Sequence, residues 1–221
     1  MTTHQDRSHP VKLQEIADSH YAQVGRRSGK PPRYFDTYEE LFESKRAEPL
    51  RLLELGVKAG GSARIWREYF PNATIVGLDF SPPPTGYPAG AHYVEGRQED
   101  PDALARACDL GAPFDIIIDD AAHVGTLAKI SHGFLYDAHL KPGGHYILED
   151  YGVALTRPEW PDAHPYEPPV DDGNRLPSFE YGMVGLIKQL VDQHLLRRDP
   201  IRIDIRPGLT VLHKRARPVA S

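Results

Sequence analysis

Short apolar runs alternate along the chain with longer segments in which apolar residues recur at helical spacing. The short runs are rich in leucine, isoleucine and valine and end at glycine or an acid, which is typical of strands buried on both faces of a sheet. We predict strands at 50–56, 73–80, 91–96, 114–120 and 145–151. We predict helices at 37–46 with Thr37 as N-cap, at 62–70 with Ser62 as N-cap, and at 100–108, 126–140 and 178–196.

This alternation of strand and helix predicts an α/β fold, a doubly wound, mostly parallel sheet covered by helices on both faces. Towards the end, "IRIDI" and "LTVLHK" flank "RPG", which predicts a C-terminal antiparallel hairpin. Residues 152–177 interrupt the pattern with six prolines and little periodicity, so this stretch is either disordered or a lid loop. We expect one domain at 37–221, preceded by a polar N-terminal segment at 1–36.

Composition narrows the possible partners. The formal net charge of −5 offers no basic surface, so we expect no nucleic-acid partner. No apolar run approaches the roughly 18–20 residues of a transmembrane helix, and the polar first residues lack the apolar core of a signal peptide. The single cysteine, Cys108, excludes a disulfide within this sequence and suits a reducing compartment. We therefore expect a cytoplasmic protein without a membrane partner.

The stretch "LLELGVKAGGSARIW" places glycines between a strand and a helix, where α/β sheets bind ligands. The spacing of Gly56, Gly60 and Gly61 differs from the dinucleotide pattern GxGxxG. Asp79 ends the next strand, where a carboxylate accepts the hydroxyl protons of a ribose. Glu54 precedes the loop, and its charge would attract a cationic cofactor and repel a diphosphate. These features favour S-adenosylmethionine over NAD, with a plain strand-to-helix turn as the alternative.

Two later strands end in pairs of acids, Asp119 with Asp120 and Glu149 with Asp150. The carboxyl ends of neighbouring parallel strands meet at one edge of a sheet, so these like charges would repel one another. A divalent cation such as Mg²⁺, Mn²⁺ or Ca²⁺ would relieve the repulsion, whereas the alternative is that the acids cap helices or stay solvated. His123 follows in the next loop and could accept a proton near neutral pH, although loop histidines are more often structural.

Four stretches together resemble a known family: "LLELGVKAGGSARIWREYFPNATIVGLDFS", "EGRQEDP", "FDIIIDDAAHV" and "LKPGGHYILEDY". They look like the metal-dependent S-adenosylmethionine O-methyltransferases of natural-product biosynthesis, which methylate sugar hydroxyls on macrolides and other glycosylated polyketides. The cephalosporin-hydroxylase-like group is also similar. The resemblance runs from about residue 34 to 214 and is weakest at 152–177. It implies a Rossmann-like methyltransferase fold.

The resemblance also implies a cofactor site. Glu54 and Gly56 would match the loop on the methionine side of S-adenosylmethionine, and Asp79 would match the ribose-binding acid. Gln98 occupies the place in "EGRQEDP" where the family has "GDQSDP", near the adenine. Two more residues complete our candidate cofactor-binding set, Ser62 and Asp119.

For the chemistry, the resemblance implies that Asp120, Glu149 and Asp150 bind magnesium and that His123 is the catalytic base beside Asp120. The family usually has "DDGSH" where this chain has "DDAAH", so a serine hydroxyl is missing.

The leading hypothesis from the sequence is therefore a divalent-metal-dependent O-methyltransferase. Its acceptor would be a small molecule, a sugar hydroxyl of a glycosylated natural product, with Trp160 and Tyr166 of the candidate lid as acceptor contacts. The alternatives are an NAD-dependent oxidoreductase and a non-catalytic S-adenosylmethionine-binding protein. The acceptor itself and the oligomeric state, a homo-oligomer included, stay open.

Overall fold

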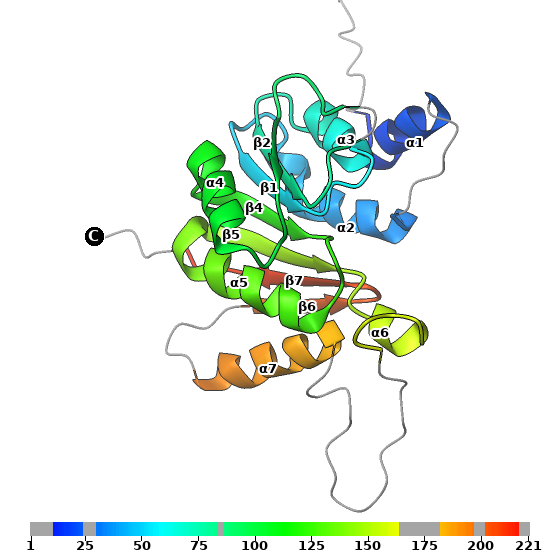
Figure 1. Cartoon of the computed structure of the whole chain (residues 1–221). Helices are drawn as coiled ribbons and strands as arrows, with labels where there is room; N and C mark the ends of the chain where they lie inside the picture. Colours follow the sequence, from blue (N-terminus) through cyan, green and yellow to red (C-terminus); the bar gives the residue numbers. More distant parts are fainter. Residues whose placement is uncertain (1–10, 24–29, 84–85, 164–181, 197–201, 217–221) are drawn as a thin grey trace, which may run out of the picture.

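In the computed structural model, the described residues are 11–23, 30–83, 86–163, 182–196 and 202–216. Seven strands form one sheet in the order β3-β2-β1-β4-β5-β7-β6 (Figure 1). The first five are parallel, β7 pairs antiparallel with β5, and β6 pairs antiparallel with β7. Their bounds are β1 Arg51–Leu55, β2 Thr74–Asp79, β3 His92–Glu95, β4 Phe114–Asp119, β5 Leu140–Glu149, β6 Arg202–Arg206 and β7 Leu209–His213.

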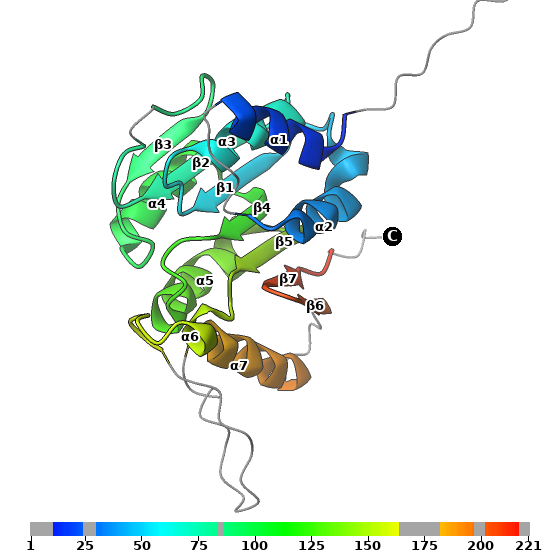
Figure 2. The same ribbon diagram turned by 90° about the vertical axis from the view of Figure 1, so that its right-hand side faces the viewer.

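Helices cover both faces of the sheet (Figure 2). One buried cluster packs α4 and α5 with α7 against the sheet, and a second packs α1, α2 and α3 against the other face. The alternating residues of β1 supply both clusters, since Leu53 and Leu55 face one and Leu52 faces the other. The helices are α1 Leu13–Gln23, α2 Pro32–Phe42, α3 Gly61–Tyr69, α4 Pro101–Gly111, α5 Gly125–His139, α6 Val153–Thr156 and α7 Gly182–Leu196, with a 3-10 turn, η1, at Glu43–Lys45.

The predicted doubly wound sheet and its C-terminal hairpin are confirmed. From β1 the chain adds β2 and β3 on one side and then crosses over to add β4 and β5 on the other. Order reverses between β1 and β4, and ligands of such sheets bind at the carboxyl ends of the strands beside this switch point. A ligand site is therefore expected at the carboxyl ends of β1, β4 and β5.

Two predicted helix starts are wrong. Helix α2 begins at Pro32 rather than after Thr37, because a proline fits the first turn of a helix, where no backbone N–H is needed. The Thr37 hydroxyl instead donates to the carbonyl of Arg33, one turn earlier. At α3 the N-cap is Gly60, whose φ of 76° is left-handed, and the Ser62 hydroxyl donates to Glu54. Strand β5 also begins earlier than predicted, at Leu140.

The polar N-terminal segment contains a helix that the sequence pattern did not predict. Only three small or medium apolar side chains of α1 are fully buried, Leu13, Ile16 and Ala17, and the helix lies against α3. The first turns of α2 also lie before residue 37. The division of the chain at 36 and 37 stays a prediction.

Much of the candidate lid lies outside the described residues, Tyr166 among them. Its described part, 152–163, contains α6 and a turn that ends near Asp162. Within the described ranges, no helix has both the length and the apolar character needed to cross a bilayer.

Candidate active site

The register of the sheet gathers acidic residues at one edge. Leu55 of β1 pairs with Asp119 of β4, which in turn pairs with Leu148 of β5. The next residue along β4, Asp120, donates its backbone N–H to the Leu55 carbonyl at 2.9 Å. Glu149 and Asp150 follow Leu148 at the same edge. The predicted meeting of the two acidic strand ends is therefore present in the fold.

Because side chains alternate along a strand, these acids lie on different faces of the sheet. Glu54 and Glu149 point towards α2 and α3, where Glu54 accepts from Ser62 and Trp66 and Glu149 accepts from Tyr38. Asp119 points to the opposite face. The four acidic strand ends therefore do not all share one centre, because successive side chains of a strand leave on opposite sides.

A lysine lies among the acids on the α2 side. Lys30 Nζ donates to Asp120 Oδ2 at 2.5 Å and to Glu149 Oε2 at 2.7 Å, and it lies 3.8 Å from Glu54 Oε1. Burial alone would lower the pKa of Lys30, but the charges of Asp120, Glu149 and Glu54 outweigh it and raise the pKa well above its usual value. Repulsion between the acids is thus relieved in part by the chain's own cation. Lys30 was not among the predicted site residues, because it lies in "GRRSGKPPR", a stretch whose glycines and prolines predict only a loop.

Helix α2 continues this contact with the acids. Lys30, Tyr34 and Tyr38 recur at a spacing of one helical turn, and each reaches an acidic strand end. The Tyr34 hydroxyl lies 2.6 Å from Asp150 Oδ1 and 2.7 Å from the Gly208 carbonyl. Tyr38 donates to Glu149 Oε1. This lysine and tyrosine spacing was the available signal for a polar helix face.

Glu149 has both carboxylate oxygens engaged by that face. One accepts from Lys30 and the other from Tyr38, and the residue is 1% exposed. Burial and the neighbouring Asp120 charge raise the pKa of Glu149 above its usual range, opposed by Lys30. Burial likewise raises the pKa of Glu54 to about 7.

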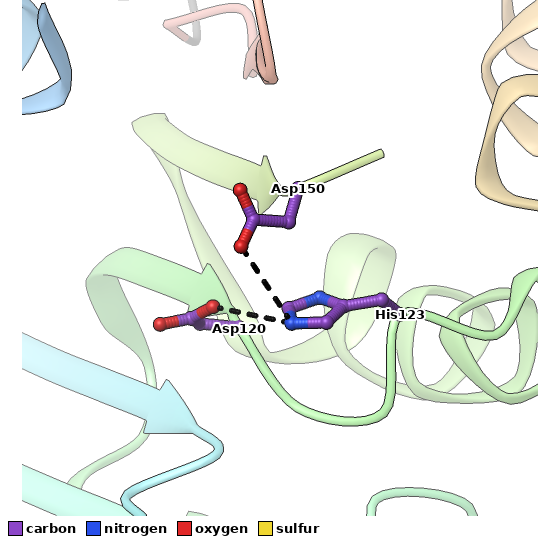
Figure 3. A group of neighbouring side chains, drawn as sticks. All are labelled: Asp120, His123 and Asp150. Carbon is purple, nitrogen blue, oxygen red and sulfur yellow. Dashed lines mark ion pairs between the residues drawn. The ribbon is translucent and has the colours of Figure 1, made fainter. Parts of the chain in front are cut away.

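The side chains of Asp120, His123 and Asp150 converge on one point (Figure 3). His123 Nε2 lies 3.7 Å from Asp120 Oδ1 and 3.9 Å from Asp150 Oδ2. One ligand atom from each residue lies within 4.8 Å of the others. His123 and Asp150 have φ of 52° and 54°, a left-handed conformation that costs energy in residues other than glycine and is concentrated at functional sites.

The donor set of this cluster suits a hard divalent cation. Two carboxylate oxygens and one imidazole nitrogen fit Mg²⁺ or Mn²⁺, and the ring's other nitrogen, Nδ1, is buried without a hydrogen-bond partner among the described residues. Of the predicted metal ligands, Asp120 and Asp150 are brought together with His123. Glu149 is adjacent but turned towards α2. Which of them bind a cation stays a prediction.

The glycine loop lies directly against the backbone of Asp120, a residue of the candidate metal-binding cluster. Gly56 has a φ of 87°, and a Cβ there would lie 2.2 Å from the Asp120 carbonyl, so only glycine permits this approach. Asp79 Oδ2 accepts from the backbone N–H groups of Val57 and Lys58, each at 2.7 Å. Asp79 therefore lies at the loop as predicted, and it also holds the loop's conformation.

Gln98 and Asp119 form a buried polar network beneath the loop that carries His123. The Gln98 amide donates to Asp119 Oδ1 at 3.2 Å and its carbonyl oxygen accepts from the backbone N–H of Ala122 at 2.8 Å. Ser131 and Tyr146 donate to Asp119 Oδ2. Burial raises the pKa of Asp119. The structure gives both residues a supporting role, and their predicted cofactor contacts stay predictions.

Trp160 closes the other side of this loop. Its indole N–H donates to the carbonyls of Ala122 and His123, at 3.2 and 3.3 Å, and its ring lies 6.0 Å from the His123 ring. Asp162 Oδ2 accepts from the backbone N–H of Gly125. The candidate lid thus begins with residues that hold the His123 loop, while the predicted acceptor contact of Trp160 stays a prediction.

The seven-stranded sheet is that of a methyltransferase fold. In structure the chain matches the MycE methyltransferase from the mycinamycin biosynthetic pathway, solved in complex with Mg, SAH and mycinamycin VI. The TM-score is 0.74 at 26% identity, and the match covers 97% of this chain and 57% of that one. The predicted fold class is thereby confirmed.

Sugar O-methyltransferases are among the sequence relatives, which confirms the predicted resemblance. The chain is 33% identical over 176 residues to the mycinamicin VI 2''-O-methyltransferase of Micromonospora griseorubida, covering 75% of this chain and 41% of that protein. It is 36% identical over 124 residues to 8-demethyl-8-(2-methoxy-alpha-L-rhamnosyl)-tetracenomycin-C 3'-O-methyltransferase of Streptomyces olivaceus, covering 53% and 32% respectively. No protein-family model matches the chain. The matches thus span less than half the length of these curated relatives.

Proposed function

We propose that this chain transfers a methyl group from S-adenosylmethionine to a hydroxyl of a glycosylated natural product, with a divalent cation bound beside the acceptor. The observation that carries the proposal is the contact between two sites. The Asp120 carbonyl lies against Gly56 of the cofactor loop, while the Asp120 carboxylate lies in the cluster with His123 and Asp150. A methyl donor and a metal-bound hydroxyl would therefore be neighbours.

Each residue of the cluster has a task in this proposal. Asp120 and Asp150 would hold the cation through the oxygens that face His123. A bound divalent cation lowers the pKa of an acceptor hydroxyl and orients it. In this proposal His123 is not a metal ligand. Its Nε2 would accept the hydroxyl proton while the oxygen bonds to the methyl carbon and the carbon–sulfur bond breaks, releasing S-adenosylhomocysteine. Glu149 is the third carboxylate of the family pattern, and it can join the cation only by leaving a partner on α2.

The cofactor would lie along the glycine loop. Gly56 lets the loop lie against the Asp120 backbone, and Asp79 at the end of β2 would accept the ribose hydroxyls. Glu54 is buried near the end of β1, and in its ionised form it would favour a sulfonium cation at the methionine end. A diphosphate would meet repulsion at the same place, which disfavours the NAD alternative.

The acceptor class follows from the relatives. The proteins named above act on a macrolide and on a rhamnosylated tetracenomycin, so we propose a sugar hydroxyl of such a compound as the acceptor. The test is methyl transfer from radiolabelled S-adenosylmethionine to a panel of demethylated glycosides. The transfer is measured with Mg²⁺, after exhaustive chelation, and after Mg²⁺ is restored. Full turnover in the chelated sample would refute the metal, and no transfer to any glycoside would refute the acceptor class.

A further inference from the structure

Lys30 occupies a position that the proposed chemistry does not use. Its side chain is 8% exposed, and its ammonium lies between two acids, Asp120 directly after β4 and Glu149 at the end of β5. It donates to one carboxylate oxygen of each. A buried ammonium among carboxylates is itself a cation at an acidic site, and a second cation bound nearby would feel its charge.

Lys30, just before α2, and Tyr34 of α2 divide the oxygens of the two aspartates between two directions. Asp120 gives Oδ2 to Lys30 and turns Oδ1 towards His123. Asp150 gives Oδ1 to Tyr34 and turns Oδ2 towards His123. One oxygen of each aspartate is therefore directed to the cluster with His123, and the other is held by Lys30 or Tyr34.

Glu149 is treated differently, since neither of its oxygens is directed to the cluster. Lys30 holds one and Tyr38 holds the other. Removing Lys30 would change two things together. It would remove a positive charge near the cluster, and it would leave Glu149 Oε2 without its ammonium partner and able to turn towards a cation. Both changes act in the same direction, towards stronger binding of a divalent cation.

We propose that Lys30 is a positioning residue that opposes divalent-cation binding at the Asp120, His123 and Asp150 cluster and reserves Glu149 for helix α2. It thereby sets both the affinity of the site and the carboxylates that a cation meets. This inference rests on the proposed metal site. It gives the buried lysine a function that a purely structural ion pair lacks, because a structural role predicts lost stability and no gain in metal affinity.

The test is isothermal titration calorimetry of Mg²⁺ and Mn²⁺ into the full chain and its variants. Lys30→Met removes the positive charge. Lys30→Gln also removes it but keeps an N–H donor for Glu149, so it provides a second variant if Lys30→Met does not fold. We expect both variants to bind Mg²⁺ about tenfold or more tightly than the wild type. We also expect Mg²⁺ to raise their melting temperature more than that of the wild type. The matched control is Lys141→Met, which removes a lysine paired with Asp115 at the opposite end of β4.

The double variant Lys30→Met with Glu149→Gln separates the two contributions. Loss of the gain in affinity would show that Glu149 had become a ligand, which supports both parts of the proposal. Retention would show that the lysine charge alone opposed the cation, which supports the charge effect and refutes the withholding of Glu149.

Folded Lys30 variants whose Mg²⁺ affinity equals or falls below that of a wild type that binds Mg²⁺ would overturn the inference and leave the proposed function standing. A wild type without Mg²⁺ binding, together with Lys30→Met that binds, would refute the metal dependence and uphold the role of Lys30. Absence of binding in both would refute both.

Discussion

The hydroxyl of Tyr34 lies 2.6 Å from Oδ1 of Asp150, so a helix from the start of the chain holds an acid at the end of β5. The contact is tightly enclosed, since a Cβ at Gly208 would lie 2.2 Å from the same hydroxyl. Tyr34 is 1% exposed, and burial together with Asp150 raises its pKa above the ordinary value. The hydroxyl therefore stays protonated and serves as a fixed hydrogen-bond donor to the carboxylate.

Tyr34→Phe tests that contact. Asp150 would lose the donor that orients it, and removal of such an outer partner weakens metal binding by about 10–100-fold. We expect weaker Mg²⁺ binding by calorimetry, with S-adenosylhomocysteine binding little changed. The matched control is Tyr69→Phe, because the buried Tyr69 hydroxyl has no hydrogen-bond partner among the described residues. Equal effects of the two variants on Mg²⁺ would show that Tyr34 acts only through packing.

His123→Ala tests the proposed base. We expect turnover to fall by about 10²–10⁴-fold while cofactor binding is retained. The remaining activity should rise with pH as solvent hydroxide replaces the base. Calorimetry with Mg²⁺ then separates two roles, since a base leaves metal affinity intact and a direct ligand does not. His92→Ala, on the exposed start of β3, serves as the control. A near-normal rate in His123→Ala would remove the histidine from the mechanism.

Asp79→Asn tests the cofactor site with less damage than alanine, because the amide oxygen can still accept from Val57 and Lys58. We expect S-adenosylhomocysteine to bind more weakly by about 1.5–3 kcal/mol, the value of a hydrogen bond to a charged acceptor. Mg²⁺ binding should change little. Unchanged cofactor affinity with a normal melting temperature would place the ribose elsewhere.

His145 predicts a pH dependence of stability away from the site. Burial, with the nearby His213 and Lys45, lowers the pKa of His145 to about 4. Its ordinary value is about 6.5, so between these values the unfolded chain binds more protons than the folded one. The folded state is therefore favoured above pH of about 6.5 and loses that contribution as the pH falls towards about 4.

The measurement is the melting temperature from pH 4 to 8 for the wild type and His145→Asn. We expect the variant to lose less stability on acidification than the wild type. The control is His92→Asn, on an exposed residue of β3. Parallel curves for the wild type and His145→Asn would show that other groups govern the acid limb.

The sequence by itself determined the sheet, because the pattern that predicts a strand lies within a few consecutive residues. The central parallel strands are short apolar runs buried on both faces, as in β1 and β4, and such a run is recognisable without knowledge of its neighbours. The order of strand and helix then restricts the topology, because crossovers in parallel sheets have one hand. The acids after β4 and β5 met at one edge for the same reason, and Gly56 adjoined them.

The tertiary structure decided how each acid is used. Whether Glu149 faces a cation or a lysine depends on Lys30, which lies just before α2 and is 119 positions away in the chain. Asp119 does not join the other acids at the strand ends, because the alternation of side chains along β4 directs it towards Ser131. Helix α1 was missed because three apolar residues in a polar segment become a buried face only when α3 lies opposite. Strand patterns are local, whereas the partners of a buried charge are set by packing between distant segments.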